Sequence, residues 1–251
     1  MNSLERSLIE KAGYDNGWEI VVESLPEQVV LASALHRASA SIKPAVRPGE
    51  WLLTVPPGSL AEELSKAEAI HFDGNGHFRI ANDAELGRLL RYAARLARSL
   101  PNLPVIRFAA AVQQELSETI ASTEVERLVR QRVGQNIYRE SLMDYWGSAC
   151  AVTGIALPAL LRASHAKPWA ECDSDAERLN VFNGFLLAAH LDALFDRYLV
   201  SFNDNGKILF SPIVTAEVRA ALGLSESLKL RWISPGHIPF LSVHRAAFRA
   251  A

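Results

Sequence analysis

Two hydrophobic periodicities organise the first hundred residues. Short runs rich in valine and isoleucine predict strands at 18–24, 28–33 and 50–55. The segment AIHFDGNGHFRI (69–80) predicts a hairpin, because Asp-Gly-Asn-Gly favours a tight turn between two apolar arms. Apolar positions three and four residues apart predict helices over 3–12 and 83–99. We therefore expect a mixed α/β unit here.

A long helical pattern follows a segment punctuated by prolines. SLPNLPVIRF (99–108) holds two prolines, which end the preceding helix and predict a hinge. Helical spacing then continues over about 108–146, where STEVE (122–126) resembles a capping box. A chain of 251 residues, 49% hydrophobic, can bury two modest cores. We expect three parts, namely a domain over 1–105, a helical linker over 106–145 and a second domain over 146–251.

The helix expected at 83–99 carries a line of arginines. Their spacings of three, four and three place them on one face, which comprises Arg88, Arg91, Arg95 and Arg98. Such a face is most often simply solvated, but it also suits contact with the phosphates of a nucleic acid. A formal net charge of −2 supplies no global positive field. Any nucleic acid must therefore be met by local patches of this kind.

Cysteine usage and the apolar segments indicate the compartment. Cys150 and Cys172 are the only cysteines and lie far apart without a C-x-x-C motif, which argues against both a disulfide framework and a four-cysteine zinc site. The charged N-terminus lacks the apolar core of a signal peptide, and polar residues interrupt the most apolar late segment, 181–195. We expect a cytoplasmic protein that does not span a membrane.

A histidine follows an apolar run in the second half of the chain. ALLRA (159–163) predicts a strand that ends near His165, and Pro168 forces the chain to turn soon afterwards. Asn183 and the glycine after it form a second turn signal. The apolar residues of FLLAAHLDALFDRYL (185–199), from Leu186 onward, have helical spacing and predict a helix.

Two carboxylates lie four residues apart in that expected helix. Asp192 and Asp196 therefore share a face, where they repel unless a cation or a basic partner lies between them. His190 lies roughly 200° around a helix from Asp192. The three side chains therefore cannot share a face if the helix already includes His190.

Four motifs in order resemble those of the HNH endonuclease family, in a branch that includes restriction enzymes. They are CAVTG (150–154), ASHAKPW (163–169), NGFLL (183–187) and LFD (194–196). The resemblance covers about residues 125–215 and implies a ββα-metal unit of two short strands and a helix around one divalent ion. In that branch CAVTG is a strand and NG-x-LL a loop. The expected fold class is α+β, with a mixed α/β domain, a helical linker and a C-terminal ββα nuclease domain.

The resemblance assigns roles to three residues. His165 matches the general base, which takes a proton from the water that attacks the scissile phosphate. An imidazole, with an ordinary pKa near 6.5, suits that task at neutral pH. Asn183 matches the residue that fixes the histidine-bearing loop by hydrogen bonds. His190 stands as the third catalytic landmark, although its offset of seven from Asn183 is short.

The metal ligands follow less directly from the resemblance. Counting nine and thirteen residues on from Asn183 gives Asp192 and Asp196, and we rank Asp192 first, with His190 and Asp196 next. Oxygen ligands would suit Mg²⁺ or Mn²⁺, whereas a site dominated by His190 would tolerate Zn²⁺ or Ni²⁺. The residue before the base is Ser164, where many relatives carry a ligand.

Several neighbours of the motifs have two interpretations. Arg162 and Lys167 flank the expected base and could each contact phosphate. Trp169 is expected to be a packing lid rather than a platform for a base. Cys150 occupies the position of the first cysteine in zinc-stapled relatives, but Thr153 replaces its partner. We therefore expect Cys150 to be buried among apolar groups.

The first hundred residues hold no catalytic motif. A sheet-bearing domain before an HNH unit is the layout of modification-dependent restriction endonucleases, and LAS (31–33) and PGEW (48–51) faintly resemble a methylcytosine reader. That resemblance suggests an aromatic pocket for a modified base, formed by Trp18, Trp51, Phe72 and Phe78. The alternative is that these aromatic residues are core.

The leading hypothesis is a metal-dependent endonuclease of a restriction system that hydrolyses double-stranded DNA, with an N-terminal specificity domain. One HNH unit nicks one strand, so a homodimer is expected, at least on DNA. One alternative is a degenerate, inactive HNH fold that binds DNA or regulates. Another is a non-specific nuclease effector or toxin, whose first domain serves delivery or sensing.

Overall fold

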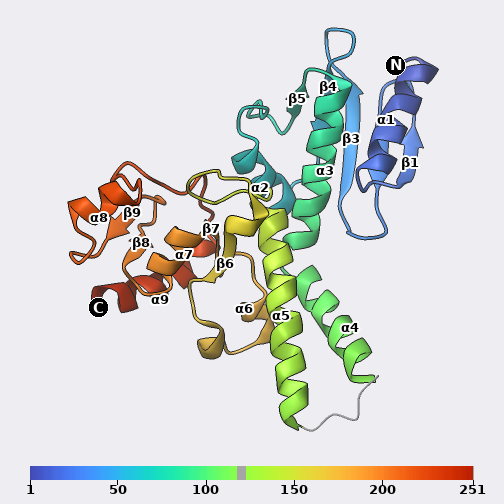
Figure 1. Cartoon of the computed structure of the whole chain (residues 1–251). Coiled ribbons are helices and arrows are strands. Elements are labelled where there is room, and N and C mark those ends of the chain that lie inside the picture. Colours follow the sequence, from blue (N-terminus) through green and yellow to red (C-terminus); the bar gives the residue numbers. More distant parts are fainter. Residues whose placement is uncertain (118–122, 251) are drawn as a thin grey trace. The chain divides into compact units, whose positions relative to one another are not determined.

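A computed structural model describes residues 1–117 and 123–250, with the side chains of residues 249 and 250 left out. The chain forms two compact units, Met1–Leu100 and Pro101–Ala251. Figure 1 shows the elements of both units. Both units contain helices and strands, so the architecture is mixed helix and sheet, as the sequence predicts. No helix in the described ranges has the length and apolar character to cross a membrane.

The first unit is a five-stranded antiparallel sheet with three helices. The strands follow chain order across the sheet, β1 (Ile20–Ser24), β2 (Val29–Ala32), β3 (Ser39–Pro44), β4 (Trp51–Thr54) and β5 (Phe78–Ile80). The helices are α1 (Ser3–Asp15), α2 (Ser59–Ala67) and α3 (Asp83–Ser99). Alternate residues of β2 and β4 are buried, which places one face of the sheet against the core. Helices α1 and α3 pack together, and α1 also contacts β2.

Most elements of this unit agree with the sequence pattern. The two expected helices and the three expected strands are present. The hairpin at 69–80 is present only in part, because Phe72 pairs with Phe78 through an isolated bridge and only the second arm is a strand. Strand β3 and helix α2 were not expected. The alternation in SASIKP involves small side chains, and Gly58 gives α2 no side-chain cap.

The second unit begins with a helical pair. Helices α4 (Leu103–Ser117) and α5 (Thr123–Tyr145) pack against each other (Figure 1). Pro104 lies in the first turn of α4, where a missing N–H costs nothing. The serine of the expected capping box, Ser122, lies outside the described residues. Both helices belong to the second unit. The segment expected to be a linker, 106–145, is therefore part of this unit.

The remainder of this unit is built from short elements. They are the 3-10 turns η1 (Pro158–Leu160) and η2 (Trp169–Glu171), strands β6 (Leu161–His165), β7 (Gly184–Ala188), β8 (Val200–Phe202) and β9 (Ile208–Phe210), and helices α6 (Asp175–Arg178), α7 (Ala189–Phe195), α8 (Ala216–Ala221) and α9 (His237–Ala250). Strands β6 and β7 form one antiparallel ribbon, and β8 and β9 form another. Helix α9 contacts β7 and β8.

Three expectations for this unit are wrong. CAVTG (150–154) is a turn rather than a strand, closed by a hydrogen bond from Gly154 N to Cys150 O at 3.1 Å. The helix expected from 185 begins only at Ala189, because 184–188 form β7, with all five residues buried. A short, continuous apolar run does not distinguish a buried strand from a buried helix. The segment NG-x-LL is accordingly mostly strand and not loop.

Cys150 is fully buried, as expected, but its surroundings are not purely apolar. Its sulfur accepts hydrogen bonds from the backbone N–H groups of Val152 at 3.5 Å, Thr153 at 3.4 Å and Ala188 at 3.3 Å. The last of these ties the turn at 150–154 to the end of β7. The sulfur therefore links the turn to the end of the strand by hydrogen bonds.

Candidate active site

The β6–β7 ribbon and helix α7 bring the motif residues into one region. The two strands pair so that His165 lies opposite Gly184 and Ser164 lies opposite Phe185. Helix α7 follows β7 without a loop and contacts β6. Consecutive residues of a strand point to opposite faces. Ser164 therefore faces α7, and His165 faces the other side, toward α5.

His165 lies in a largely enclosed setting. Its Nε2 is 2.9 Å from the backbone oxygen of Arg178, and a carbonyl oxygen only accepts, so Nε2 carries the proton. The ring stacks on Tyr138, with centroids 3.8 Å apart, and meets Trp169 edge-on at 5.8 Å. Burial lowers the pKa of His165 to about 4. The imidazole is therefore neutral at neutral pH, and Nδ1 carries a lone pair that can accept a proton.

Tyr138 of α5 supports this site, although no motif predicts it. Its hydroxyl donates to the backbone oxygen of Asn183 at 2.8 Å, while its ring covers His165. The side chain is buried, and burial raises the pKa of the phenol well above its ordinary value, so it remains a donor. The only sequence signal was its place in the helical tract before the first motif. A long-range contact of this kind leaves no local pattern.

The position directly after Asn183 requires a glycine. A Cβ atom at this position would lie 2.0 Å from the backbone oxygen of Ser164 and 2.2 Å from the Tyr138 hydroxyl. Both distances are far below any real contact. Only a residue without a side chain allows α5 and β6 to approach the start of β7 this closely.

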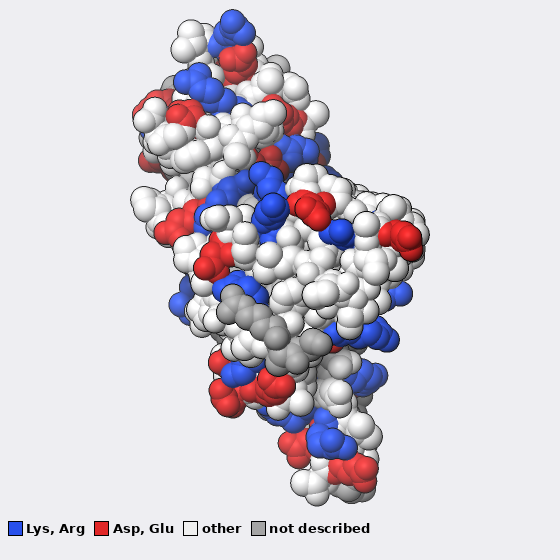
Figure 2. Space-filling view, turned by 90° about the vertical axis from the view of Figure 1, so that its left-hand side faces the viewer, with Lys and Arg blue, Asp and Glu red and all other residues white. Residues whose placement is uncertain are grey.

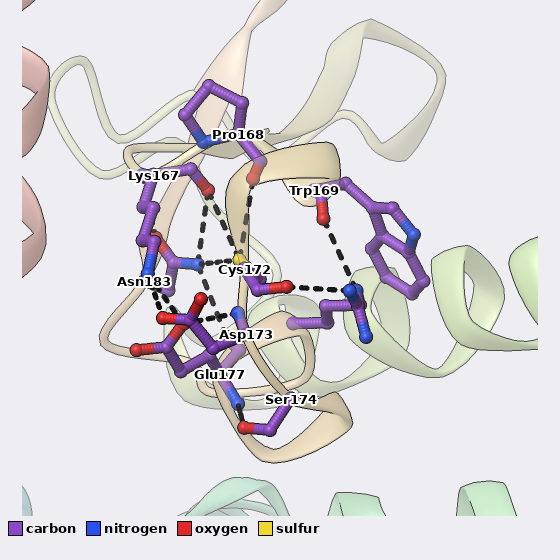
Figure 3. A network of polar contacts seen from close by, with 9 residues as sticks. Lys167, Pro168, Trp169, Cys172, Asp173, Ser174, Glu177 and Asn183 are labelled. Atoms are coloured by element: carbon purple, nitrogen blue, oxygen red, sulfur yellow. Dashed lines mark hydrogen bonds and ion pairs between the residues drawn. The ribbon is translucent and has the colours of Figure 1, made fainter.

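Asn183 joins the two ends of the segment between the strands (Figure 3). Its side-chain oxygen accepts from Lys167 N at 2.8 Å, and its Nδ2 lies 3.2 Å from the oxygens of Lys167 and Glu177. The same nitrogen lies 3.3 Å from the sulfur of Cys172. The Asn183 backbone oxygen also accepts from Ala166 N at 3.0 Å. Fully buried, this residue fixes the chain directly after His165.

Lys167 is engaged within the same loop (Figure 3). Its ammonium lies 2.9 Å from Asp173 and 2.8 Å from Glu177, and these carboxylates raise its pKa. The side chain is only 17% exposed. Of the two interpretations of Lys167, its position favours a structural role over a phosphate contact, because two carboxylates already pair with its charge. Arg162 is exposed and donates to the backbone oxygens of Ala159 and Leu161, so its guanidinium lies at the surface.

The expected metal ligands lie on α7 and at its end. Asp192, in the first turn, accepts a hydrogen bond from Ser164 Oγ at 2.6 Å. Asp196 follows one turn later, and partial burial and the charge of Asp192 raise its pKa. Helix α7 already includes His190, which therefore points away from the face that carries Asp192. No ion pair involves either aspartate within the described part of the chain.

The donor set decides which ions fit. No group of three or more His, Cys, Asp or Glu side chains suited to a metal exists in residues 1–117 and 123–250. A closed, four-ligand zinc site is therefore not present in those ranges. Mg²⁺ and Mn²⁺ are bound by oxygen, and Mg²⁺ commonly takes one or two carboxylates and fills its other positions with water and phosphate. Asp192, with Ser164 beside it, fits an ion of that type.

A cavity of about 670 Å³ is lined in part by Trp169 and Arg178, which both contact His165. Its walls come from α4, α5 and the loop after β6, and include Phe108, Arg127 and Arg130. Trp169 packs on Gly134 of α5, where any Cβ would lie 2.3 Å from the indole. The indole thus fills space between the loop and the helix, as expected for a packing residue.

The arginines of α3 are engaged to different degrees. Arg88 forms a two-pronged ion pair with Glu68, at 2.8 and 2.9 Å, and Arg91 donates to Asn16 at 2.9 Å. Arg95 and Arg98 are half-buried and also have partners. These guanidinium groups are therefore less available to contact phosphate than their spacing suggests. Figure 2 shows the same mixing, with Lys and Arg lying among Asp and Glu on the surface drawn there.

The four aromatic residues proposed for a base pocket are mostly core. Trp18 and Phe78 are at most 1% exposed, and the Trp18 indole donates to Leu90 O at 2.8 Å. Trp51 is 2% exposed and donates to Asp83 at 2.9 Å. Phe72 is half-buried against Phe78, with centroids 5.2 Å apart. Three of the four residues thus stabilise the first unit and form no open aromatic pocket.

These features define the class of site. Two antiparallel strands followed directly by a helix, with a histidine at the end of the first strand and an asparagine before the second, form a ββα unit. Residues 150–203 match the family model of the HNH endonucleases. The match runs from the turn at Cys150 through both strands and α7 to the end of β8. The chain therefore contains an HNH endonuclease domain. None of the curated proteins that were compared matches the chain.

Proposed function

We propose that the chain is a metal-dependent endonuclease that hydrolyses phosphodiester bonds in double-stranded DNA. The observation that supports this best is the state of His165. Its Nε2–H is held by a backbone carbonyl, its pKa is lowered to about 4, and it lies one residue from the Ser164–Asp192 pair. This is a neutral proton acceptor in the same strand as the serine that holds a candidate ion ligand.

The residues perform distinct tasks in this proposal. His165 Nδ1 accepts a proton from the water molecule whose oxygen attacks phosphorus. Tyr138 and the Arg178 carbonyl hold the imidazole plane and its tautomer, and Asn183 holds the chain on either side. Asp192 would hold a divalent ion, Mg²⁺ or Mn²⁺, which supplies positive charge to the phosphate and the leaving oxygen.

A nicking assay on supercoiled DNA tests the proposal. The H165A variant is expected to lose activity by about 100-fold or more in Mg²⁺ or Mn²⁺, the usual contribution of a general base. The matched control is H77A, because His77 is on the surface of the first unit. Wild-type rates in H165A would contradict the mechanism. A degenerate HNH fold that only binds DNA predicts no cleavage by any variant and no binding of divalent ions.

A narrower proposal is a modification-dependent restriction enzyme, in which Met1–Leu100 reads the DNA. Supporting this is a cavity of about 310 Å³ in that unit, lined by Trp51, His71, Arg79 and Glu85, among others. Its charged and small apolar walls suit the polar edge of a single base. Comparing cleavage of plain, methylated, hydroxymethylated and phosphorothioate DNA tests it. Equal cleavage of all four would instead favour a non-specific nuclease effector.

The oligomeric state follows from the single site per chain. One HNH unit cuts one strand, so we infer a homodimer, at least on DNA, for a double-strand break. Light scattering with and without duplex DNA measures this. A strict monomer that cuts both strands at once would contradict it.

A further inference from the structure

The hydroxyl of Ser164 makes one contact that the proposed chemistry does not yet use. Ser164 Oγ donates to Oδ1 of Asp192 at 2.6 Å, a short, charge-assisted hydrogen bond. Ser164 is 1% exposed, so water cannot easily replace this partner. The serine hydroxyl is therefore a fixed neighbour of the carboxylate.

The position of this contact follows from the ribbon. Ser164 and His165 are adjacent in β6 and face opposite sides, so the serine points at α7 while the histidine points at α5. Asp192 lies in the first turn of α7, which begins directly after β7. The pairing of β6 with β7, which leads directly into α7, thus determines the positions of both His165 and the Ser164–Asp192 pair.

The charges around Asp192 make the contact significant. Asp196 lies one turn away, and no Lys or Arg forms an ion pair with either residue in the described ranges. Ser164 contributes a hydrogen bond without adding charge. It occupies Oδ1 and leaves Oδ2 of the carboxylate for another partner.

We propose that Ser164 is a positioning residue that holds Asp192 as the ligand of a divalent ion, in place of a second charged ligand. This inference rests on the proposed function, because it assumes that Asp192 binds the ion. Hydrogen-bond partners of metal ligands orient them, and losing one typically weakens ion affinity by about 10- to 100-fold. A single carboxylate held by a neutral partner also predicts a weak site that depends on Mg²⁺ or Mn²⁺ concentration.

Binding of Mn²⁺ to the full chain tests this without relying on turnover. Electron paramagnetic resonance of free Mn²⁺ gives the affinity of the wild type and of S164A, S164T, S201A and D192N. The matched control is Ser201, a buried strand serine whose hydroxyl contacts His244 at 3.0 Å rather than Asp192. Thermal unfolding of each variant is measured alongside to show that it is folded.

We expect S164A to weaken Mn²⁺ binding by about tenfold or more, with S164T close to the wild type because it keeps the hydroxyl. S201A is expected to bind Mn²⁺ as the wild type does. In nicking assays, S164A should raise the Mn²⁺ concentration for half-maximal rate while the rate at saturating Mn²⁺ changes little. That split separates positioning of the ligand from a direct role in the chemistry.

Three results would overturn the inference. If S164A bound Mn²⁺ like the wild type while D192N did not bind, Asp192 would stand as ligand and Ser164 would have no positioning role. If S164A and S201A weakened Mn²⁺ binding equally, the weaker binding would come from lost packing and not from the lost hydrogen bond to Asp192. Absence of Mn²⁺ binding by the wild type would overturn the metal dependence of the proposed function as well. The first two results leave that function intact.

Discussion

The ring of Tyr138 lies stacked on the imidazole of His165, with centroids 3.8 Å apart and planes 17° apart. The same residue donates its hydroxyl to the Asn183 backbone at 2.8 Å. One side chain of α5 thus covers the candidate base and anchors the start of the second strand.

Separating these two contributions requires two substitutions of Tyr138. Y138F keeps the stacked ring and removes one hydrogen bond, and the Asn183 oxygen retains Ala166 N as a donor. We expect it to lower the free energy of unfolding by about 1 kcal/mol and to leave nicking nearly unchanged. Y138L removes the aromatic cover and should reduce both stability and rate. Chemical denaturation and nicking assays measure these effects. Equal rates in the two variants would show that stacking does not matter for catalysis.

Gly184 is expected to be the least tolerant glycine of the site. In G184A, the new methyl group meets the Ser164 carbonyl and the Tyr138 hydroxyl at 2.0 and 2.2 Å, so the ribbon or α5 must move. We expect a loss of about 3 kcal/mol or more, measured by denaturant unfolding. G87A, inside α3, is the comparison, with an expected change below about 1 kcal/mol of either sign, because its neighbour is an amide tip at 3.2 Å. A fully stable G184A would contradict this close packing.

Stability should fall as the solution is acidified below about pH 6.5. Burial lowers the pKa of both His165 and His244 to about 4. Between their ordinary pKa and that value, the unfolded chain binds more protons than the folded one, so acid favours unfolding. Each histidine contributes up to about 3 kcal/mol across this window, by the pKa difference alone. The contribution levels off below about pH 4.

Replacing one of these histidines tests that dependence. H244Q removes a titrating group, while its amide can still donate toward the backbone oxygen of Phe195, where His244 Nε2 now lies at 3.0 Å. Urea unfolding at several values between pH 4 and 6.5 should give a shallower slope for H244Q than for the wild type. Identical slopes would show that His244 does not titrate in this window.

The two cations beside the base should affect DNA binding differently. R162A is expected to weaken binding for all sequences and to reduce the salt slope by about one ion, as loss of an exposed phosphate contact does. K167A instead removes a partner of Asp173 and Glu177, so its main effect should be on the thermal stability of the loop. Fluorescence anisotropy at several salt concentrations, with melting curves, distinguishes them. If K167A changed the salt slope and R162A did not, Lys167 rather than Arg162 would be the phosphate contact.

The sequence was most informative where chemistry and local geometry coincide. His165 at a strand end, Asn183 at a turn and the helix over 83–99 follow from apolar spacing, from Pro168 and from Asn-Gly turn chemistry. Residues 184–188 were misassigned because five buried apolar residues suit a helix or a strand equally well. The strand pairing that settles the question comes from β6, twenty residues earlier.

Contacts between distant segments were beyond the sequence pattern. Tyr138 meets His165 only after α5 packs on the ribbon, and His244 of α9 stacks on Phe195, with centroids 3.7 Å apart, without any motif at either position. The ion pairs of Lys167 could not be predicted, because its loop partners, Asp173 and Glu177, become neighbours only when Asn183 closes the loop. The same limit applies to the burial of Trp18 and Trp51, whose indole partners lie on α3.

The pairing of His165 with Gly184 has a consequence for how errors in this ribbon would act. A slip of β6 by one residue would exchange the two faces, sending the imidazole toward Asp192 and the serine toward α5. A side chain at position 184 would clash with Ser164 in the aligned ribbon, whereas glycine allows this alignment. Gly184 is therefore needed for the correct register of the two strands. That register keeps the candidate base, His165, and the candidate ion ligand, Asp192, on opposite sides of a ribbon only five residues long.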